Sequence, residues 1–255
     1  MKTLLIFITI LMTCACKPIN YNSKDKNNNY IIKDFLLEQN RNDGSQYWVL
    51  TSEKARYDQF NKSIISYNPT VKIFDKDKER YLVVSKQLRI YNNGELIKFI
   101  GDVKVVQIPT RNIEINSNIV EWTPSDYQFN FQGYTKLTRS FKNERNLDIA
   151  TSNIILNTFN GVLSSENKTT AESLATKFTE EEYLIADSLN GNVKKGYLQL
   201  NNCKYIRPNK IISSSNICKI DWPTNNVTDN NRIITQEIKM FAISDFVESR
   251  IFIPD

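Results

Sequence analysis

The stretch GDVKVVQIPTRNIEINSNIVEW, at residues 101–122, decides how the chain folds. Val103 and Val105 are separated by one polar residue, and so are Ile113 and Ile115. Successive side chains of a β-strand point to opposite faces, so a period of two places these apolar residues on one face of a sheet. The stretch therefore predicts two half-buried antiparallel strands joined by a turn.

The same alternation occurs on both sides of this stretch. Val71 and Ile73 flank one lysine, and Phe129 and Phe131 flank one asparagine. Between the runs, residues 92–94 (Asn-Asn-Gly) are typical of a hairpin turn because Asn and Gly tolerate a positive φ. We expect an all-β chain built from antiparallel strand pairs. Its interior should be lined by Val71, Ile73, Val103, Val105, Ile113, Ile115, Phe129 and Phe131.

Two short sequence elements recur along the chain. The first begins with a serine, and its first four copies start 32 to 35 residues apart. Its copies start at Ser52, Ser85, Ser117, Ser152 and Ser215. The second begins with Asn or Gly, and its copies start at Asn68, Gly101, Gly133 and Gly191. One repeat is thus about two strands. A strand pair cannot bury its apolar face alone, so we expect stacked pairs that share one continuous interior.

Composition excludes several classes of function. The chain of 255 residues has no histidine, which removes a Ser-His-Asp triad, a Cys-His pair and every His-ligated metal site. No Gly-rich phosphate loop or paired-cysteine metal motif occurs. The net charge is +5 without a run of Lys and Arg, so nucleic acid is not an expected partner. The charged residues 75–79 are expected to form a solvated hairpin loop.

The N-terminus has the pattern of an export signal. Lys2 precedes an apolar run over residues 4–12, which is too short for a transmembrane helix of roughly 17–25 residues. Cys14 and Cys16 follow at once, as at a bacterial lipoprotein processing site. We favour Cys16 as the lipid-modified first residue of the mature chain, because the small residue Ala15 precedes it. Cys14, a cleaved signal without lipid and an uncleaved signal are the alternatives.

Four segments follow from these patterns. Residues 1–16 form the lipoprotein-like signal peptide. Residues 17–30 form a flexible polar tether, because they contain almost no apolar side chain to bury. Residues 31–165 form the main β-domain, and residues 166–255 continue it or form a second β-repeat region. Over residues 169–185 a helix is an alternative to strands.

Two cysteines remain beyond the signal, Cys203 and Cys218. An exported protein lies in a compartment that permits disulfides, so these two are candidates for pairing. Two separate buried thiols are the alternative, because the distance between the two residues does not follow from the sequence.

Two segments resemble a known family. They are DGSQYWVLTSEKARYD at residues 43–58 and NPTVKIFDKD at residues 68–77, and a Gly-Asp-Val element at residues 101–103 accompanies them. Together they resemble the LptC family of periplasmic components of the lipopolysaccharide export machinery, in particular its cyanobacterial-type members. The resemblance covers roughly residues 30–165 well and the remainder only through the repeat pattern.

The resemblance implies a twisted, open β-jellyroll whose apolar interior shields acyl chains. The implied ligand is lipopolysaccharide or a related glycolipid. The implied partners are inner-membrane ABC transporter permeases and a periplasmic bridge jellyroll protein, which would pair with a strand edge near residues 47–50 or 238–243. An ATPase partner powers the transfer, so the resemblance implies no catalytic residue, cofactor or metal here. The implied location is the periplasm, attached to the inner membrane through an N-terminal lipid or an uncleaved signal.

A structural or adhesive envelope β-repeat protein without a lipid ligand is the competing hypothesis. In that case the interior is only a core. The two hypotheses differ in whether the interior is filled by the chain's own side chains or is open to a ligand.

We predict that the mature protein begins at Cys16 and that this residue is lipid-modified. The physical basis is the short apolar segment that ends in Ala15-Cys16 and precedes a polar tether. Intact-mass analysis of protein extracted from membranes measures this directly. A mature N-terminus other than cysteine, or an unprocessed chain that still begins at Met1, contradicts the prediction.

Overall fold

The fold is described from a computed structural model, which describes residues 21–24, 30–59, 61–109, 112–140, 146–174, 182–207, 211–221, 239–242 and 248–251. Within these residues the regular structure is β-strand, apart from two short 3₁₀ turns. The paired strands are antiparallel and belong to one sheet. The predicted all-β fold is therefore confirmed, and its form is jellyroll-like.

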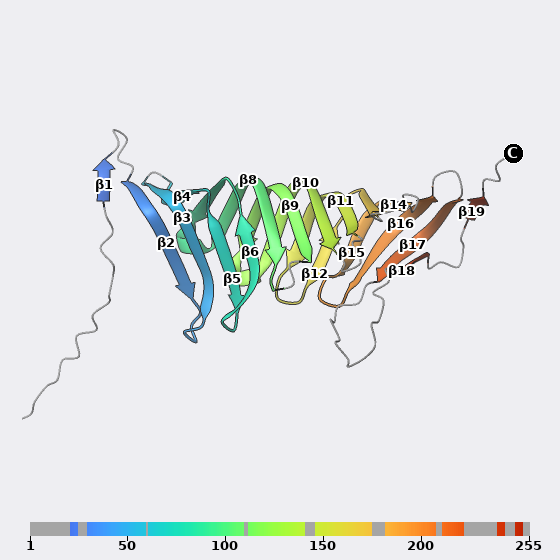
Figure 1. The fold of residues 1–255 in the computed structure, drawn as a ribbon, viewed down its shortest axis with the longest axis horizontal. Helices are drawn as coiled ribbons and strands as arrows, with labels where there is room; N and C mark the ends of the chain where they lie inside the picture. The colour runs from blue at the N-terminus through green and yellow to red at the C-terminus, as the bar shows by residue number, and fades with distance from the viewer. Residues whose placement is uncertain are drawn as a thin grey trace, which may run out of the picture.

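The strands follow one another along the long axis of the molecule, from β2 near one end to β19 at the other (Figure 1). In chain order they are β1 (Tyr21–Lys24), β2 (Tyr30–Asn40), β3 (Gln46–Asp58), β4 (Ser63–Tyr67), β5 (Thr70–Asp75), β6 (Lys78–Val84), β7 (Gln87–Tyr91), β8 (Leu96–Gln107), β9 (Ile113–Thr123), β10 (Gln128–Ser140), β11 (Asn146–Asn157), β12 (Val162–Ser165), β13 (Thr169–Leu174), β14 (Glu182–Ala186), β15 (Ser188–Asn192), β16 (Tyr197–Arg207), β17 (Ile211–Asp221), β18 (Lys239–Ala242) and β19 (Glu248–Ile251). The 3₁₀ turns are η1 (Asn92–Gly94) and η2 (Pro124–Asp126).

The sheet is folded into two layers, because several long strands pair with different neighbours along their two halves, while β9 and β10 continue from one layer into the other across a bulge. The first half of β3 pairs with β5 and the second half with β4. Likewise β8 pairs with β7 and then β6, and β11 pairs with β13 and then β12.

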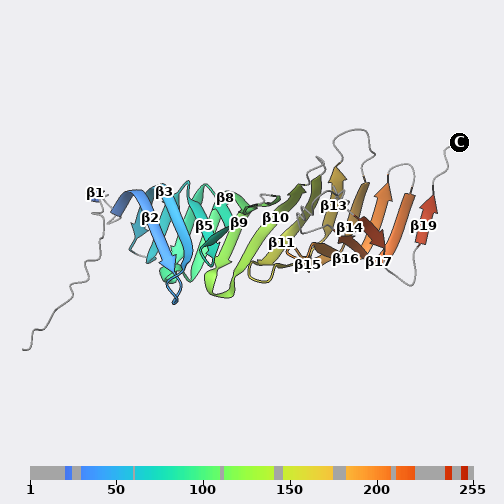
Figure 2. The ribbon, with the colours of Figure 1, turned by 60° about the horizontal axis from the view of Figure 1, so that its bottom comes forward.

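We call the two layers wing 1 and wing 2. Wing 1 comprises residues 46–51, 70–75, 78–84, 103–107, 113–117, 135–140, 146–151, 169–174, 182–186, 203–207 and 211–215. Wing 2 comprises residues 54–58, 63–67, 87–91, 96–100, 119–123, 128–132, 152–157, 162–165, 188–192, 197–201 and 217–221. Figure 2 shows β13 of wing 1 and β15 of wing 2 in separate layers.

The wings join along a crease that crosses the long strands near their middle, and the repeated serines lie on it. Four of these serines use the hydroxyl group to donate a hydrogen bond to the carbonyl oxygen two residues ahead, at 3.0, 2.9, 3.3 and 2.9 Å. They are Ser52, Ser85, Ser117 and Ser215. Such local bonds compete with the regular ladder and support a bend. The serine repeat in the sequence is therefore the repeat of the crease.

The second repeated element also lies on the crease, with Gly101 in β8, Gly133 in β10 and Asn68 in the link between β4 and β5. Asn68, Gly101 and Gly133 have φ values of 49°, 78° and 75°, in the region that favours Asn and Gly. Gly191 does not belong to this set, so its assignment to the repeat is wrong. It lies within β15 in wing 2, where a Cβ atom would come within 2.5 Å of the carbonyl oxygen of Tyr197.

The crease also shifts the phase of the apolar alternation. In β9, Ile113, Ile115 and Ser117 are buried before the crease, whereas Val120 and Trp122 are buried after it. The bend uses one extra residue, and a shift of one residue moves a side chain to the other face. The period of two therefore holds within each half strand and not across the whole strand.

The outer faces of the wings carry charged pairs between neighbouring strands. Lys104 pairs with Glu114 at 2.9 Å, and Lys136 pairs with Asp148 at 2.8 Å. Partly exposed pairs of this kind contribute roughly 0–1 kcal/mol each, so they support the register without determining it. The fold depends mainly on the apolar interior.

The local predictions have different outcomes. Residues 92–94 form the expected turn, as η1 between β7 and β8. Residues 75–79 form the expected hairpin between β5 and β6. The helix considered for residues 169–185 is wrong at both ends, which form β13 and β14.

β1 lies within the segment expected to be a tether and pairs with β2. The expected signal peptide, residues 1–16, lies outside the described residues.

The two expected sheet edges also differ in outcome. The expectation of an edge at residues 47–50 is wrong, because Val49 pairs with Glu38 of β2 on one side and with Lys72 of β5 on the other. Among the described strands, residues 35–40 of β2 pair with β3 alone. At the opposite end, β18 lies within residues 238–243 and pairs with β17.

We predict that replacing Val103 by aspartate lowers the free energy of unfolding by about 3 kcal/mol or more. Val103 is 1% exposed, so the variant buries a carboxylate with no partner. Urea denaturation followed by tryptophan fluorescence measures the change. Val162→Asp is the matched control, because Val162 is 45% exposed and its replacement should change stability by less than about 0.5 kcal/mol. Equal losses in the two variants would show that Val103 does not face a packed interior.

Candidate functional site

The interior between the wings is one continuous apolar cluster. All eight residues expected to line it are at most 4% exposed. Six of them lie in wing 1, whereas Phe129 and Phe131 lie in wing 2 and face the others from the opposite layer. The structure therefore brings the eight residues together around a single interior.

Side chains of the two wings fill this interior. The ring of Tyr81 in wing 1 lies 6.3 Å from the ring of Phe129 in wing 2, and Trp48 in wing 1 lies 6.2 Å from Trp122 in wing 2, between centroids. These are contact distances for edge-to-face aromatic pairs. A cavity beside Ile115 has a volume of about 10 Å³, roughly the space that one water needs. An acyl chain can enter only if the wings part or these side chains move.

Opposite the crease, hairpin turns of wing 1, such as the one at residues 75–78, face turns of wing 2, such as the one at residues 123–128. We call the line along which these turns meet the mouth. The hydroxyl group of Tyr47 in wing 1 donates a hydrogen bond to the carbonyl oxygen of Pro124 in η2. Trp48 Nε1 donates a hydrogen bond to Gln39 Oε1 at 2.6 Å. Gly94 of η1 lies close to the same oxygen, since a Cβ atom at this glycine would be 3.3 Å from it. A small number of contacts thus closes the mouth near the N-terminal end.

A pocket of about 90 Å³ opens at the mouth, which is several times the space that one water needs. Both wings contribute to its lining, and we call it the mouth pocket. Its polar lining residues include Arg41, Asp75, Arg80, Gln107, Tyr127 and Lys194.

The mouth pocket carries an excess of positive charge. The guanidinium of Arg41 lies 4.3 Å from the centre of the Tyr47 ring, a cation–π distance. Arg80 and Asp75 form an ion pair at 3.5 Å with about half of each side chain exposed. Because this pair is largely neutral in sum, Arg41 and the lysine at position 194 leave the pocket cationic.

Lys194 lies at the wing 2 side of the mouth pocket. Its ammonium donates a hydrogen bond to the carbonyl oxygen of Phe159 at 2.6 Å. Partial burial lowers the pKa of Lys194 from its ordinary value, and the nearby carboxylate of Asp75 opposes that shift. An ammonium has three donors, so it can bind a further acceptor while it keeps this bond.

Two buried donors of the mouth pocket have no hydrogen-bond partner within the part of the chain that the structure describes. They are the hydroxyl group of Tyr81, which is 5% exposed, and Nε1–H of Trp122, which is 1% exposed. Burial raises the pKa of Tyr81 to about 12, so its hydroxyl group stays a neutral donor at physiological pH. A buried donor without an acceptor costs about 1–3 kcal/mol. The residues that line the pocket thus include two buried donors for which the described residues supply no acceptor.

The residues of the mouth pocket were not predicted from the sequence. The alternating run that contains Tyr81 and Val83 could have placed the Tyr81 ring in the interior. Arg41 and Lys194 lie in turns that are distant in the sequence, and no spacing connects them. Only the closure of the two wings brings them to one pocket.

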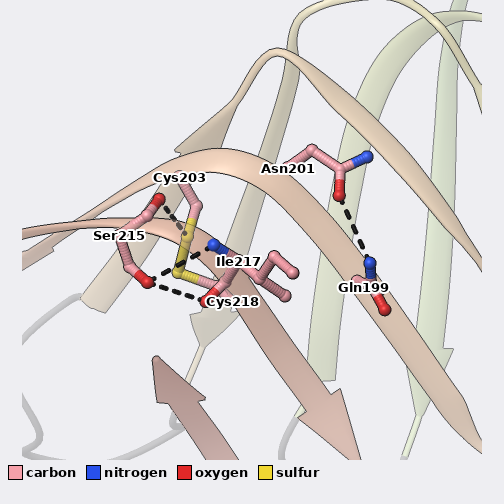
Figure 3. Close-up of a disulfide and its surroundings, with 6 residues drawn as sticks. All are labelled: Gln199, Asn201, Cys203, Ser215, Ile217 and Cys218. Carbon is pink, nitrogen blue, oxygen red and sulfur yellow. Dashed lines mark hydrogen bonds between the residues drawn. A yellow bond between two sulfur atoms is a disulfide. The ribbon is translucent and has the colours of Figure 1, made fainter. Parts of the chain in front are cut away.

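Cys203 and Cys218 form a disulfide that crosses the crease (Figure 3). Cys203 lies in wing 1, opposite Ser215 of β17, and Cys218 lies in wing 2, opposite Leu200 of β16. Their Cα atoms are 5.9 Å apart. The hydroxyl group of Ser215 donates to the carbonyl oxygen of Ile217 at 2.9 Å beside the bond. The disulfide therefore joins the two wings covalently at the C-terminal part of the interior.

Other expected features lie outside the described residues or are not found within them. Cys16 and Cys14, the alternative lipid anchors, fall outside the described ranges. No helix of the described residues is long and apolar enough to cross a membrane. In the same residues, no group of three or more His, Cys, Asp or Glu side chains is placed to hold a metal ion.

Comparison with known protein families identifies a family for this chain. The family model described as lipopolysaccharide-assembly, LptC-related matches residues 3–179. These residues include strands β1 to β13, and with them most of the mouth pocket and all eight interior residues. A search of curated proteins found no match.

Proposed function

Because the chain belongs to the lipopolysaccharide-assembly, LptC-related family, we propose that its interior shields the acyl chains of lipopolysaccharide and passes the lipid to a partner jellyroll. Membership of the family makes the chain a component of lipopolysaccharide transport rather than an enzyme, in the periplasm and associated with the inner membrane. The observation that carries the finer proposal is the continuous apolar interior between two wings.

The free energy of acyl-chain burial supports this role. Removing a methylene group from water is favourable by about 0.8 kcal/mol, so a few methylenes per chain suffice for binding without a specific polar contact. The wings already hide their apolar faces against each other, as the contacts of Trp48 with Trp122 indicate. Lipid binding would exchange these contacts for contacts with acyl chains. Such an exchange between apolar partners has a small net cost, which suits a protein that must also release its ligand.

A filled interior is also expected of a structural or adhesive β-repeat protein. The family match favours transport, since it extends over the strands that build the interior. The contacts at the mouth favour it as well, because Tyr47 joins the wings there through side-chain contacts alone, one hydrogen bond to a turn and ring contacts with Trp122 and Tyr127. Contacts of this kind can open without loss of the strand ladders.

The anchor and the partners belong to the same proposal. Lipid-modified Cys16 would hold the domain at the inner membrane beside the ABC transporter permeases. The unpaired side of residues 35–40 of β2 would pair with a strand of a neighbouring jellyroll, and β18 or β19 would do so at the other end. Leu36, which is 56% exposed, lies within the first of these edges.

We predict that photoreactive residues at Ile115 and Phe129 capture lipopolysaccharide in cells. Both side chains are at most 1% exposed and face each other's wing, so lipid reaches them only when it enters the interior. Immunoblotting for a lipopolysaccharide adduct after irradiation is the measurement. Lys76, in the β5–β6 turn, is the control position and should give little adduct. A folded, exported protein without adducts at Ile115 and Phe129 would favour the structural-repeat hypothesis.

The same experiment tests the edge. A probe at Leu36 should capture a protein neighbour, because it lies on a strand with an unpaired side in the described structure. A probe at Val49 should not, since β3 is paired on both sides. Protein adducts at Val49 alone would contradict the assignment of β2 as the edge.

A further inference from the structure

We propose that the mouth pocket binds the phosphate group of a phosphorylated glycolipid. This inference rests on the proposed function, because the acyl chains of the same molecule would occupy the interior. The phosphate oxygens would accept hydrogen bonds from Tyr81 and Trp122 and would lie beside the cationic groups of Arg41, Arg80 and Lys194.

The two unpartnered donors carry the inference. Buried polar groups almost always have a hydrogen-bond partner, so each exception needs a physical reason. The rings of Tyr81 and Trp122 both lie against Phe129, at 6.3 and 5.7 Å between centroids, and both residues line the mouth pocket. An oxygen-rich group in the 90 Å³ pocket would supply the acceptors that these two donors lack.

The charges identify the group as an anion. The pocket lining contains three cationic side chains and one carboxylate, and that carboxylate is already paired with Arg80. Hydrogen bonds between charged donors and phosphate are about twice as strong as neutral ones. A neutral sugar would satisfy the two orphan donors and leave the excess of positive charge uncompensated.

The shape of the site indicates that the anion is attached to an apolar chain. The 10 Å³ cavity shares Tyr81 and Gln107 with the mouth pocket and is otherwise lined by apolar residues that include Val105, Ile113 and Ile115. Tyr81 and Gln107 therefore lie between the charged mouth and the apolar interior, on the path that a lipid entering at the mouth would take. An amphiphile fits both parts of this path, whereas inorganic phosphate fits only the outer part.

Binding of two lipids to the full-length chain in detergent tests the inference. The probes are lipid A that carries its phosphate groups, the same lipid A after removal of the phosphates, and inorganic phosphate. Tryptophan fluorescence reports binding, because Trp122 lines the pocket. We expect phosphorylated lipid A to bind about ten-fold more tightly than the dephosphorylated form, as one charge-assisted hydrogen bond allows.

Two variants test the residues. Tyr81→Phe and Lys194→Gln should each reduce the preference for phosphorylated lipid A by about three-fold or more. Tyr81→Phe should also leave the melting temperature unchanged or raise it, because the hydroxyl group it removes has no partner in the described structure. The matched controls are Tyr134→Phe, at a residue 69% exposed, and Lys86→Gln, whose side chain is 70% exposed. Both should keep the preference of the unmodified chain.

Three results would overturn the inference. Equal binding of the two lipids would remove the phosphate from the site while leaving the acyl-chain proposal intact. Displacement of lipid A by inorganic phosphate at a concentration near the dissociation constant of the lipid would make the pocket a site for free phosphate. Binding of neither lipid would contradict the proposed function together with the phosphate site.

Discussion

The rest of the structure depends on the crease, where one hydrogen-bonded sheet bends so that its apolar faces meet. A single sheet of this length would leave one apolar face in water, and the bend buries that face without a second domain. Serine hydroxyl groups at positions such as Ser117 and left-handed residues such as Gly133 make the bend local and repeatable. Because the bend recurs in each repeat, the interior extends along the chain as one cluster.

The same geometry sets the conditions for a ligand. Strong ladders hold the wings together along the crease, and the Cys203–Cys218 disulfide reinforces that side near the C-terminal part. At the mouth the wings touch only through side chains and turns, as in the bond from Tyr47 to Pro124. Opening is therefore easier at the mouth than at the crease. The charged pocket lies on the side that opens, where a headgroup can stay near water while acyl chains enter.

Much of the fold was predictable from the sequence, because a half-buried strand leaves a period of two that needs no tertiary information. Val103, Val105, Ile113 and Ile115 show this within one hairpin. The crease was visible as a serine repeat but could not be recognised as a bend, since a local hydrogen bond leaves no signature of its own.

The misassignments have physical causes too. Residues 47–50 were taken for an edge because the Asn-rich segment before residue 30 and the alternation that begins near Tyr47 made β3 look like the first strand, whereas residues 30–40 form β2 and pair with it in a hairpin. The mouth pocket could not be predicted at all, since Arg41 and Lys194 meet only when the wings close.

The distance between the wing tips, measured by electron paramagnetic resonance between two spin labels, tests the central claim most directly. One label at Lys76 in wing 1 and one at Ser125 in wing 2 report the opening of the mouth, and both residues are exposed. A second pair at Ser125 and Asn160, both in turns of wing 2, is the control. Lipopolysaccharide should lengthen the first distance and leave the second unchanged. An unchanged distance across the mouth, with lipid bound in the interior, would contradict the account.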